Sequence, residues 1–87
     1  MIDNKAESRF EVQEDGHLAW ADYRIRDGKY FIPHVEAEPP LRGKGSASRL
    51  MQQIVDHARV EKLVIVPRCS YARAWFERHP EEEDVLS

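Results

Sequence analysis

The chain has 87 residues, of which 41% are hydrophobic and 33% are charged, and its net charge is -3. This length predicts one domain over residues 1–87. The composition is too apolar for a disordered chain. The excess of acidic over basic residues makes nucleic acid an unfavourable partner. No apolar run approaches the ~20 residues that span a bilayer, no secretory signal opens the chain, and one cysteine cannot form an intramolecular disulfide. We therefore expect a cytoplasmic domain without a membrane partner. We also expect residues 1–8 and 82–87 to be loosely ordered.

The first part of the chain predicts three antiparallel strands joined by two short hairpins. Phe10 and Val12 alternate with charged residues, which is typical of a half-buried strand. Pro33 lacks an N–H donor, so the third strand should be bulged or exposed at a sheet edge there. The expected strands cover residues 9–14, 18–25 and 29–36, with turns at Asp15–Gly16 and Asp27–Gly28.

After residue 40 the apolar period changes to that of a helix. One helical face over residues 45–59 is formed by Ala47, Leu50, Met51, Ile54, Val55 and Ala58. The run Leu63–Val66 predicts a strand covered on both faces, and residues 71–79 return to helical spacing. The order β-β-β-α-β-α predicts an α/β fold, a mixed and mostly antiparallel sheet with helices packed on it.

The loop that enters the first helix has the chemistry of a phosphate site. Amides in the first helical turn have no intrahelical partner, and glycines at 43 and 45 allow a ligand to approach the backbone. Arg42 and Lys44 add positive charge, and Ser46 adds a hydroxyl. A short glycine motif alone fits a flexible basic loop equally well.

The loop Leu41–Ala47, followed by an amphipathic helix, resembles the Arg/Gln-x-x-Gly-x-Gly/Ala signature of GCN5-related N-acetyltransferases, with Arg42, Gly45 and Ala47 at its fixed positions. The chain is also similar to the very small YjdJ-like subgroup of that family. The His-x-Glu element of that subgroup fits His34–Glu36, and its Pro-x-Cys-x-aromatic element fits Pro67–Tyr71. Its ending, Arg-x-His-Pro-Glu, fits Arg78–Glu81, which has one residue fewer between arginine and histidine. This resemblance covers about residues 9 to 85. The N-terminal helices that help to form the acceptor pocket in the larger family have no counterpart here, so an open or differently built acceptor site is expected.

The resemblance implies an acetyl-coenzyme A site. The pyrophosphate would meet the amides between Gly43 and Ala47, the pantetheine arm would follow the end of the third strand, and the thioester would lie between that strand and the next. The residues expected to bind the cofactor are Val35, Ala37, Arg42, Gly43, Lys44, Gly45, Ser46, Ala47, Cys69, Tyr71 and Arg73.

Acetyl transfer to an amine requires a proton acceptor and stabilisation of the leaving thiolate. His34 and Glu36 are two apart on a strand and share a face, so either could accept the proton; a packed histidine and a solvated carboxylate are equally good interpretations. Cys69, near a helix N-terminus, could take the acetyl group, line the cofactor site or be inert. Tyr71 or Ser70 could protonate the thiolate. Arg68 and Arg73 either meet the 3′-phosphate or are solvated.

Three functions fit these patterns. The first is an N-acetyltransferase that uses acetyl-coenzyme A and a primary amine, which could be a protein lysine, a polyamine or a small metabolite. The second is a non-catalytic acyl-coenzyme A-binding module, and the third is an adaptor that binds nucleic acid. The four histidines lack metal-ligand spacing, so no metal is expected. A homo-oligomer is compatible with so small a domain.

Overall fold

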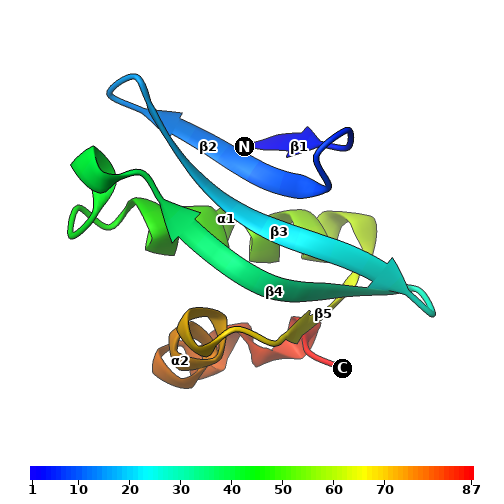
Figure 1. The fold of residues 1–87 in the computed structure, drawn as a ribbon. Helices are drawn as coiled ribbons and strands as arrows, with labels where there is room; N and C mark the ends of the chain where they lie inside the picture. Colours follow the sequence, from blue (N-terminus) through cyan, green and yellow to red (C-terminus); the bar gives the residue numbers. More distant parts are fainter.

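The computed structural model describes residues 1–87, and it contains one five-stranded sheet with the order β1-β2-β3-β4-β5. Neighbouring strands are antiparallel except β4 and β5, which are parallel because α1 connects them across one face of the sheet. Figure 1 shows α1 behind the sheet and α2 beside β4 and β5. The strands are β1 (Ile2–Asn4), β2 (Arg9–Glu14), β3 (His17–Arg26), β4 (Lys29–Ala37) and β5 (Val64–Pro67); the α-helices are α1 (Ser46–Glu61) and α2 (Ser70–Arg78), and the 3₁₀ helices are η1 (Pro39–Leu41) and η2 (Pro80–Val85).

The expected α/β fold is confirmed, and so are both hairpin turns. Asp15, Gly16, Asp27 and Gly28 all have positive φ, the backbone that two-residue hairpins require. The structure adds the short strand β1 at one edge of the sheet, where Ile2 pairs with Glu11.

The bulge expected at Pro33 is present, in the interior of the sheet. Asp22 pairs with His34, whereas Arg24 pairs with Phe31, so Tyr23 of β3 faces two residues of β4, Ile32 and Pro33. A bulge lets the proline occupy a central strand without leaving a ladder hydrogen bond unmade. It also changes which side chains of β4 point to each face.

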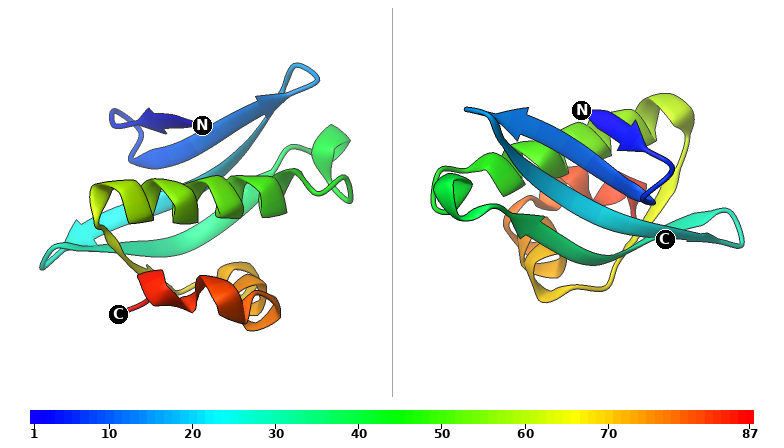
Figure 2. Two further views of the ribbon diagram at one scale, coloured as in Figure 1. Left: turned by 180° about the vertical axis from the view of Figure 1, so that it is seen from behind. Right: turned by 45° about the horizontal axis from the view of Figure 1, so that its top comes forward.

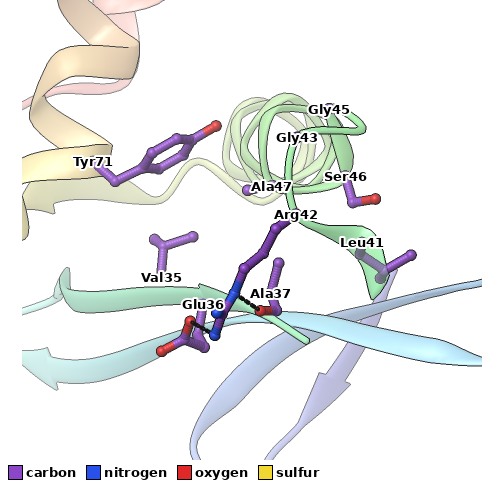
Figure 3. Close-up of a pocket in the computed structure, with 10 residues that line it drawn as sticks. All are labelled: Val35, Glu36, Ala37, Leu41, Arg42, Gly43, Gly45, Ser46, Ala47 and Tyr71. Carbon is purple, nitrogen blue, oxygen red and sulfur yellow. Dashed lines mark hydrogen bonds and ion pairs between the residues drawn. The ribbon is translucent and has the colours of Figure 1, made fainter. Parts of the chain in front are cut away.

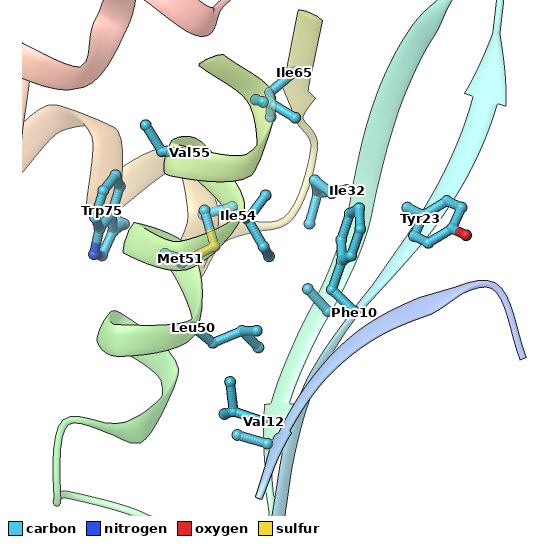
Figure 4. Close-up of a cluster of buried hydrophobic side chains, with 14 of the residues drawn as sticks. Phe10, Val12, Tyr23, Ile32, Leu50, Met51, Ile54, Val55, Ile65 and Trp75 are labelled. Carbon is cyan, nitrogen blue, oxygen red and sulfur yellow. The ribbon is translucent and has the colours of Figure 1, made fainter. Parts of the chain in front are cut away.

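The core lies between the sheet and α1. Leu50, Met51, Ile54, Val55 and Ala58 are buried, as the helical period predicts, and they meet side chains from the near face of the strands (Figure 4). The sheet supplies Phe10, Val12, Tyr23 and Ile32, and α2 supplies Trp75, whose indole Nε1 donates to Ser48 Oγ at 2.9 Å.

β5 differs from the expectation of a strand covered on both faces. It is an edge strand in which only Ile65 is fully buried, while Val64 and Val66 are half-buried. The C-terminal segment covers part of its free edge, because the amide of Ser87 donates to the Ile65 carbonyl.

Both ends of the chain make side-chain contacts with the rest of the fold. The Tyr23 hydroxyl donates to Asp3 at 2.6 Å, which fixes β1. At the other end, η2 buries Val85 and Glu82, and the Glu82 carboxylate accepts hydrogen bonds from Arg59 and Gln52. Seen from behind, η2 and α2 lie beside α1 (Figure 2). None of the helices has the length and apolar character needed to cross a bilayer.

Candidate functional site

A cavity of about 470 Å³ opens where β4 ends and α1 begins. Four segments meet there: the last residues of β4, the loop before α1, the first turn of α1, and the start of α2 (Figure 3). Its lining residues are Val35, Glu36, Ala37, Leu41, Arg42, Gly43, Gly45, Ser46, Ala47 and Tyr71. We call it the loop cavity.

Two glycines shape the loop that borders this cavity. Gly43 and Gly45 have φ values of 77° and 81°, in the left-handed region that residues with a side chain rarely adopt. Gly45 is the N-cap of α1 and has no side chain to satisfy the first amides of the helix. The glycine spacing noticed in the sequence thus corresponds to two required backbone conformations.

The result is a row of backbone amides without acceptors. The Lys44 amide donates to the Leu41 carbonyl, and hydrogen bonding within α1 begins with the Arg49 amide, which donates to Gly45. The amides of Gly43, Gly45, Ser46, Ala47 and Ser48 donate to no carbonyl of the chain. Unpaired amides at a helix N-terminus, where the helix macrodipole is positive, form a binding site for an anion such as phosphate.

A carboxylate from β2 fixes the start of α1. Glu14 accepts hydrogen bonds from the Ser46 hydroxyl at 2.6 Å and from the Arg49 guanidinium at 2.7 and 2.9 Å. The Arg49 guanidinium, and after it the Ser46 hydroxyl, lower the pKa of Glu14 to about 2. Glu14 was not identified in the sequence because this contact joins residues 32 and 35 positions apart. The Ser46 side chain consequently faces β2.

Arg42 bridges the loop and the end of β4. Its Nε donates to the Ala37 carbonyl at 3.1 Å, and Nη2 lies 3.4 Å from Glu36 Oε1. The other Glu36 oxygen lies 3.2 Å from His34 Nε2. The structure therefore brings His34 and Glu36 together with Arg42, although only Glu36 and Arg42 line the loop cavity.

β4 has a free edge along this cavity because β5 diverges from it. The parallel pairing ends at Ile32 and Pro67, and the Ile32 carbonyl accepts the amides of both Arg68 and Cys69 as the chain turns away. The Glu38 amide donates to the Leu18 carbonyl of β3. In an antiparallel ladder, alternate residues point their backbone N–H and C=O groups to opposite sides of the strand, so those of Val35 and Ala37 point away from β3, toward the side from which β5 has diverged.

Of the remaining predicted residues, only Tyr71 lines the loop cavity. Burial raises the pKa of its hydroxyl, so Tyr71 keeps its proton at neutral pH. Cys69 is the N-cap of α2, where Sγ accepts the Ala72 amide at 3.3 Å. Arg73 Nε lies 3.4 Å from the Pro67 carbonyl, and the exposed Lys44 lies outside the lining. Leu41 lines the cavity and was expected only as part of the loop.

Residues 9–85 match the family model of the GCN5-related N-acetyltransferases. The fold is similar to the NMR solution structure of a GCN5-like protein from Staphylococcus aureus. The two chains are 25% identical, the TM-score is 0.63, and the similarity covers 92% of this chain and 89% of that chain.

Proposed function

The chain belongs to the GCN5-related N-acetyltransferase family, and from this premise we propose that it transfers an acetyl group from acetyl-coenzyme A to a primary amine. The observation that carries the proposal is the set of amides without acceptors at the entrance of the loop cavity, those of Gly43 and of Gly45 to Ser48. A diphosphate is the part of this substrate that needs several N–H donors at one point.

The residues around the cavity fit the rest of the cofactor. The backbone groups of Val35 and the amide of Ala37, on the free edge of β4, would bond the amides of an extended pantetheine arm, as a further strand would; the Ala37 carbonyl already accepts Arg42 Nε. The half-buried Tyr71 extends from α2 into the cavity, with its hydroxyl toward α1 (Figure 3). The cavity of about 470 Å³ lies within the range of small-molecule sites.

Acetyl-coenzyme A supplies an activated acetyl thioester; the chain must supply proton transfer and orientation. Glu36 and His34 form a carboxylate–imidazole pair that accepts the proton of the attacking amine. Arg42 orients Glu36 by its contact with the second oxygen of that carboxylate. The protonated Tyr71 hydroxyl is the donor to the departing sulfur.

We assign Cys69 a capping role in this scheme. Its sulfur accepts a backbone amide of the first turn of α2, and so supports the position of Tyr71 two residues later. Direct attack by the amine, with both substrates bound together, needs no acetylated cysteine.

Calorimetry with acetyl-coenzyme A and with acetyl-pantetheine tests the proposal, because the second compound keeps the thioester but lacks the diphosphate together with the adenosine 3′-phosphate. We expect acetyl-coenzyme A to bind at least tenfold more tightly, and mass spectrometry to show its acetyl group on an amine from a panel. Equal affinities would refute the diphosphate assignment. Tight binding with hydrolysis only, and no amine acetylated, would refute the transferase.

A further inference from the structure

The face of the sheet opposite α1 is not covered by any helix, as Figure 1 shows from the front. We call it the outer face. Side chains two apart on a strand share a face, so β3 presents Asp22, Arg24 and Arg26 there, and their cross-strand partners on β4 include His34 and Phe31. The structure thus leaves a charged, accessible surface next to the proposed catalytic pair.

Two hollows lie on the outer face, and they have opposite charge. The first, of about 530 Å³, is lined by Glu7, Asp22 and His34, among others. The second, of about 190 Å³, is lined by Arg26 and Arg68. We call them the acidic hollow and the basic hollow.

The two hollows lie side by side, and we call the pair the groove. Arg24 and Pro33 line both of them, so the groove runs from His34, past the bulge of β4, to Arg68 beyond the end of β5. The Arg68 guanidinium is held over the Phe31 ring, 5.3 Å from its centroid, which orients one end of the groove.

The charges of the groove are separated rather than neutralised. Asp22 and Arg24 are neighbours on the same face of β3, yet they form no ion pair within 4.0 Å, and Arg26 and Arg68 also have no carboxylate partner. By contrast, Arg9, Arg42, Arg49 and Arg59 are all paired with carboxylates. The guanidinium groups of the groove therefore remain available to an external anion.

The acidic end of the groove adjoins the proposed cofactor. His34 lines the acidic hollow and Glu36 lines the loop cavity, and the two side chains are 3.2 Å apart, so this pair lies between the two spaces. Pro33, shared by both hollows, follows Ile32, where β4 and β5 begin to diverge.

We infer that the acetyl acceptor is a small amine that also carries an anionic group, a carboxylate or a phosphate. This inference rests on the proposed function. The ammonium group enters the acidic hollow beside Asp22 and His34, and the anionic group is held by Arg24, Arg26 and Arg68. A polyamine fits this groove poorly, because its second ammonium would meet the guanidinium groups.

The transfer balances without a further reactant. The ammonium group first gives one proton to solvent, the neutral amine nitrogen then forms a bond to the acetyl carbonyl carbon, and the C–S bond breaks with its electron pair going to sulfur. The amine loses a proton to His34, and the sulfur takes the proton of Tyr71; solvent then returns the two groups to their starting states.

The test compares initial rates of transfer from acetyl-coenzyme A to four amines: β-alanine, O-phosphoethanolamine, ethanolamine and putrescine. We expect kcat/KM to be highest for an acceptor with an anionic group, and the comparison of the first two distinguishes carboxylate from phosphate. In the double variant Arg24→Gln/Arg26→Gln, KM for that acceptor should rise about 5- to 10-fold, while the affinity for acetyl-coenzyme A stays unchanged. Lys62→Gln, which removes an exposed charge at the far end of α1, is the matched control.

A binding experiment separates this inference from the proposed function. With ¹⁵N-labelled protein, β-alanine and O-phosphoethanolamine should shift the amides of Asp22, Arg24 and Arg26, and the double variant should lose these shifts. Putrescine or ethanolamine as the preferred acceptor, with intact acetyl-coenzyme A binding, refutes the inference alone. If the wild-type protein does not bind acetyl-coenzyme A, the proposed function is refuted. The amide shifts then show separately whether the groove binds an anionic amine.

Discussion

Alanine at the two loop glycines tests the proposed diphosphate site, because both positions have positive φ. An alanine in the left-handed region costs about 1–2 kcal/mol, so in Gly43→Ala and Gly45→Ala the free loop relaxes to another conformation. Binding must restore the native loop against this cost, which weakens acetyl-coenzyme A affinity about 5- to 30-fold. The new Cβ at 45 would also lie 3.0 Å from Arg49 Nη1, whereas at 43 nothing lies within 4 Å, so Gly45→Ala should be the less stable variant.

Gly28→Ala is the matched control. Its φ is 74° and nothing would lie within 4 Å of its Cβ, but it belongs to the hairpin between β3 and β4, away from the loop cavity. All three variants should lower Tm by about 4–8 °C for each kcal/mol lost, and only the two loop variants should lose affinity in calorimetry. If Gly28→Ala weakens binding as much as Gly43→Ala does, the loop geometry is not what binds the cofactor.

Three further predictions follow from individual contacts. The pKa of Glu14 is depressed to about 2, so its contribution to stability is present above the ordinary carboxyl pKa and is lost as pH falls toward about 2. Urea unfolding should therefore show the difference in unfolding free energy between wild type and Glu14→Gln shrinking from pH 5 to pH 2. A difference that stays constant over this range would contradict the reasoning. Ile54→Ala removes a fully buried side chain and should lower the free energy of unfolding by about 2–5 kcal/mol, measured by the same urea assay. A loss of less than about 1 kcal/mol would contradict the packing described for this core. Cys69→Ser should keep the cap and most of the transfer rate, whereas Cys69→Ala should cost about 0.5–2 kcal/mol of stability; a folded Cys69→Ser without activity would show that the thiol is chemically required.

Local patterns predicted the fold because the signals themselves are local. Two Asp–Gly turns fix the hairpins, and the apolar spacing of α1 depends on neighbours three and four positions away. The same spacing leaves Ser48 and His57 outside the apolar face of α1. In the structure, Ser48 Oγ accepts a hydrogen bond from the indole Nε1 of Trp75. The His57 ring contacts the Phe10 ring edge-on, with their centroids 5.7 Å apart. Such contacts depend on elements that the period of one helix does not describe.

Non-local charge contacts were the least predictable part. The acidic run Glu81–Asp84 has the composition of a solvated tail, but Arg59 binds both Glu82 and Asp84 and holds η2 against α1. For the candidate site, the glycine loop and the His34–Glu36 pair are visible in the sequence. The groove of the outer face is not, because its arginines come from β3 and from the segment after β5, more than 40 residues apart.

The bulge at Ile32–Pro33 decides which side chains of β4 reach each of the two sites. Side chains of a strand alternate with a period of two, so a regular ladder continued from the Arg24–Phe31 pair at the same chain length would place His34 opposite the buried Ala21 instead of Asp22. His34 and Glu36 would then turn toward the helices, and Val35 toward water. Since the same strand borders the loop cavity and the groove, loss of the bulge at unchanged length would disconnect them, while β2, β3 and α1 kept their own contacts.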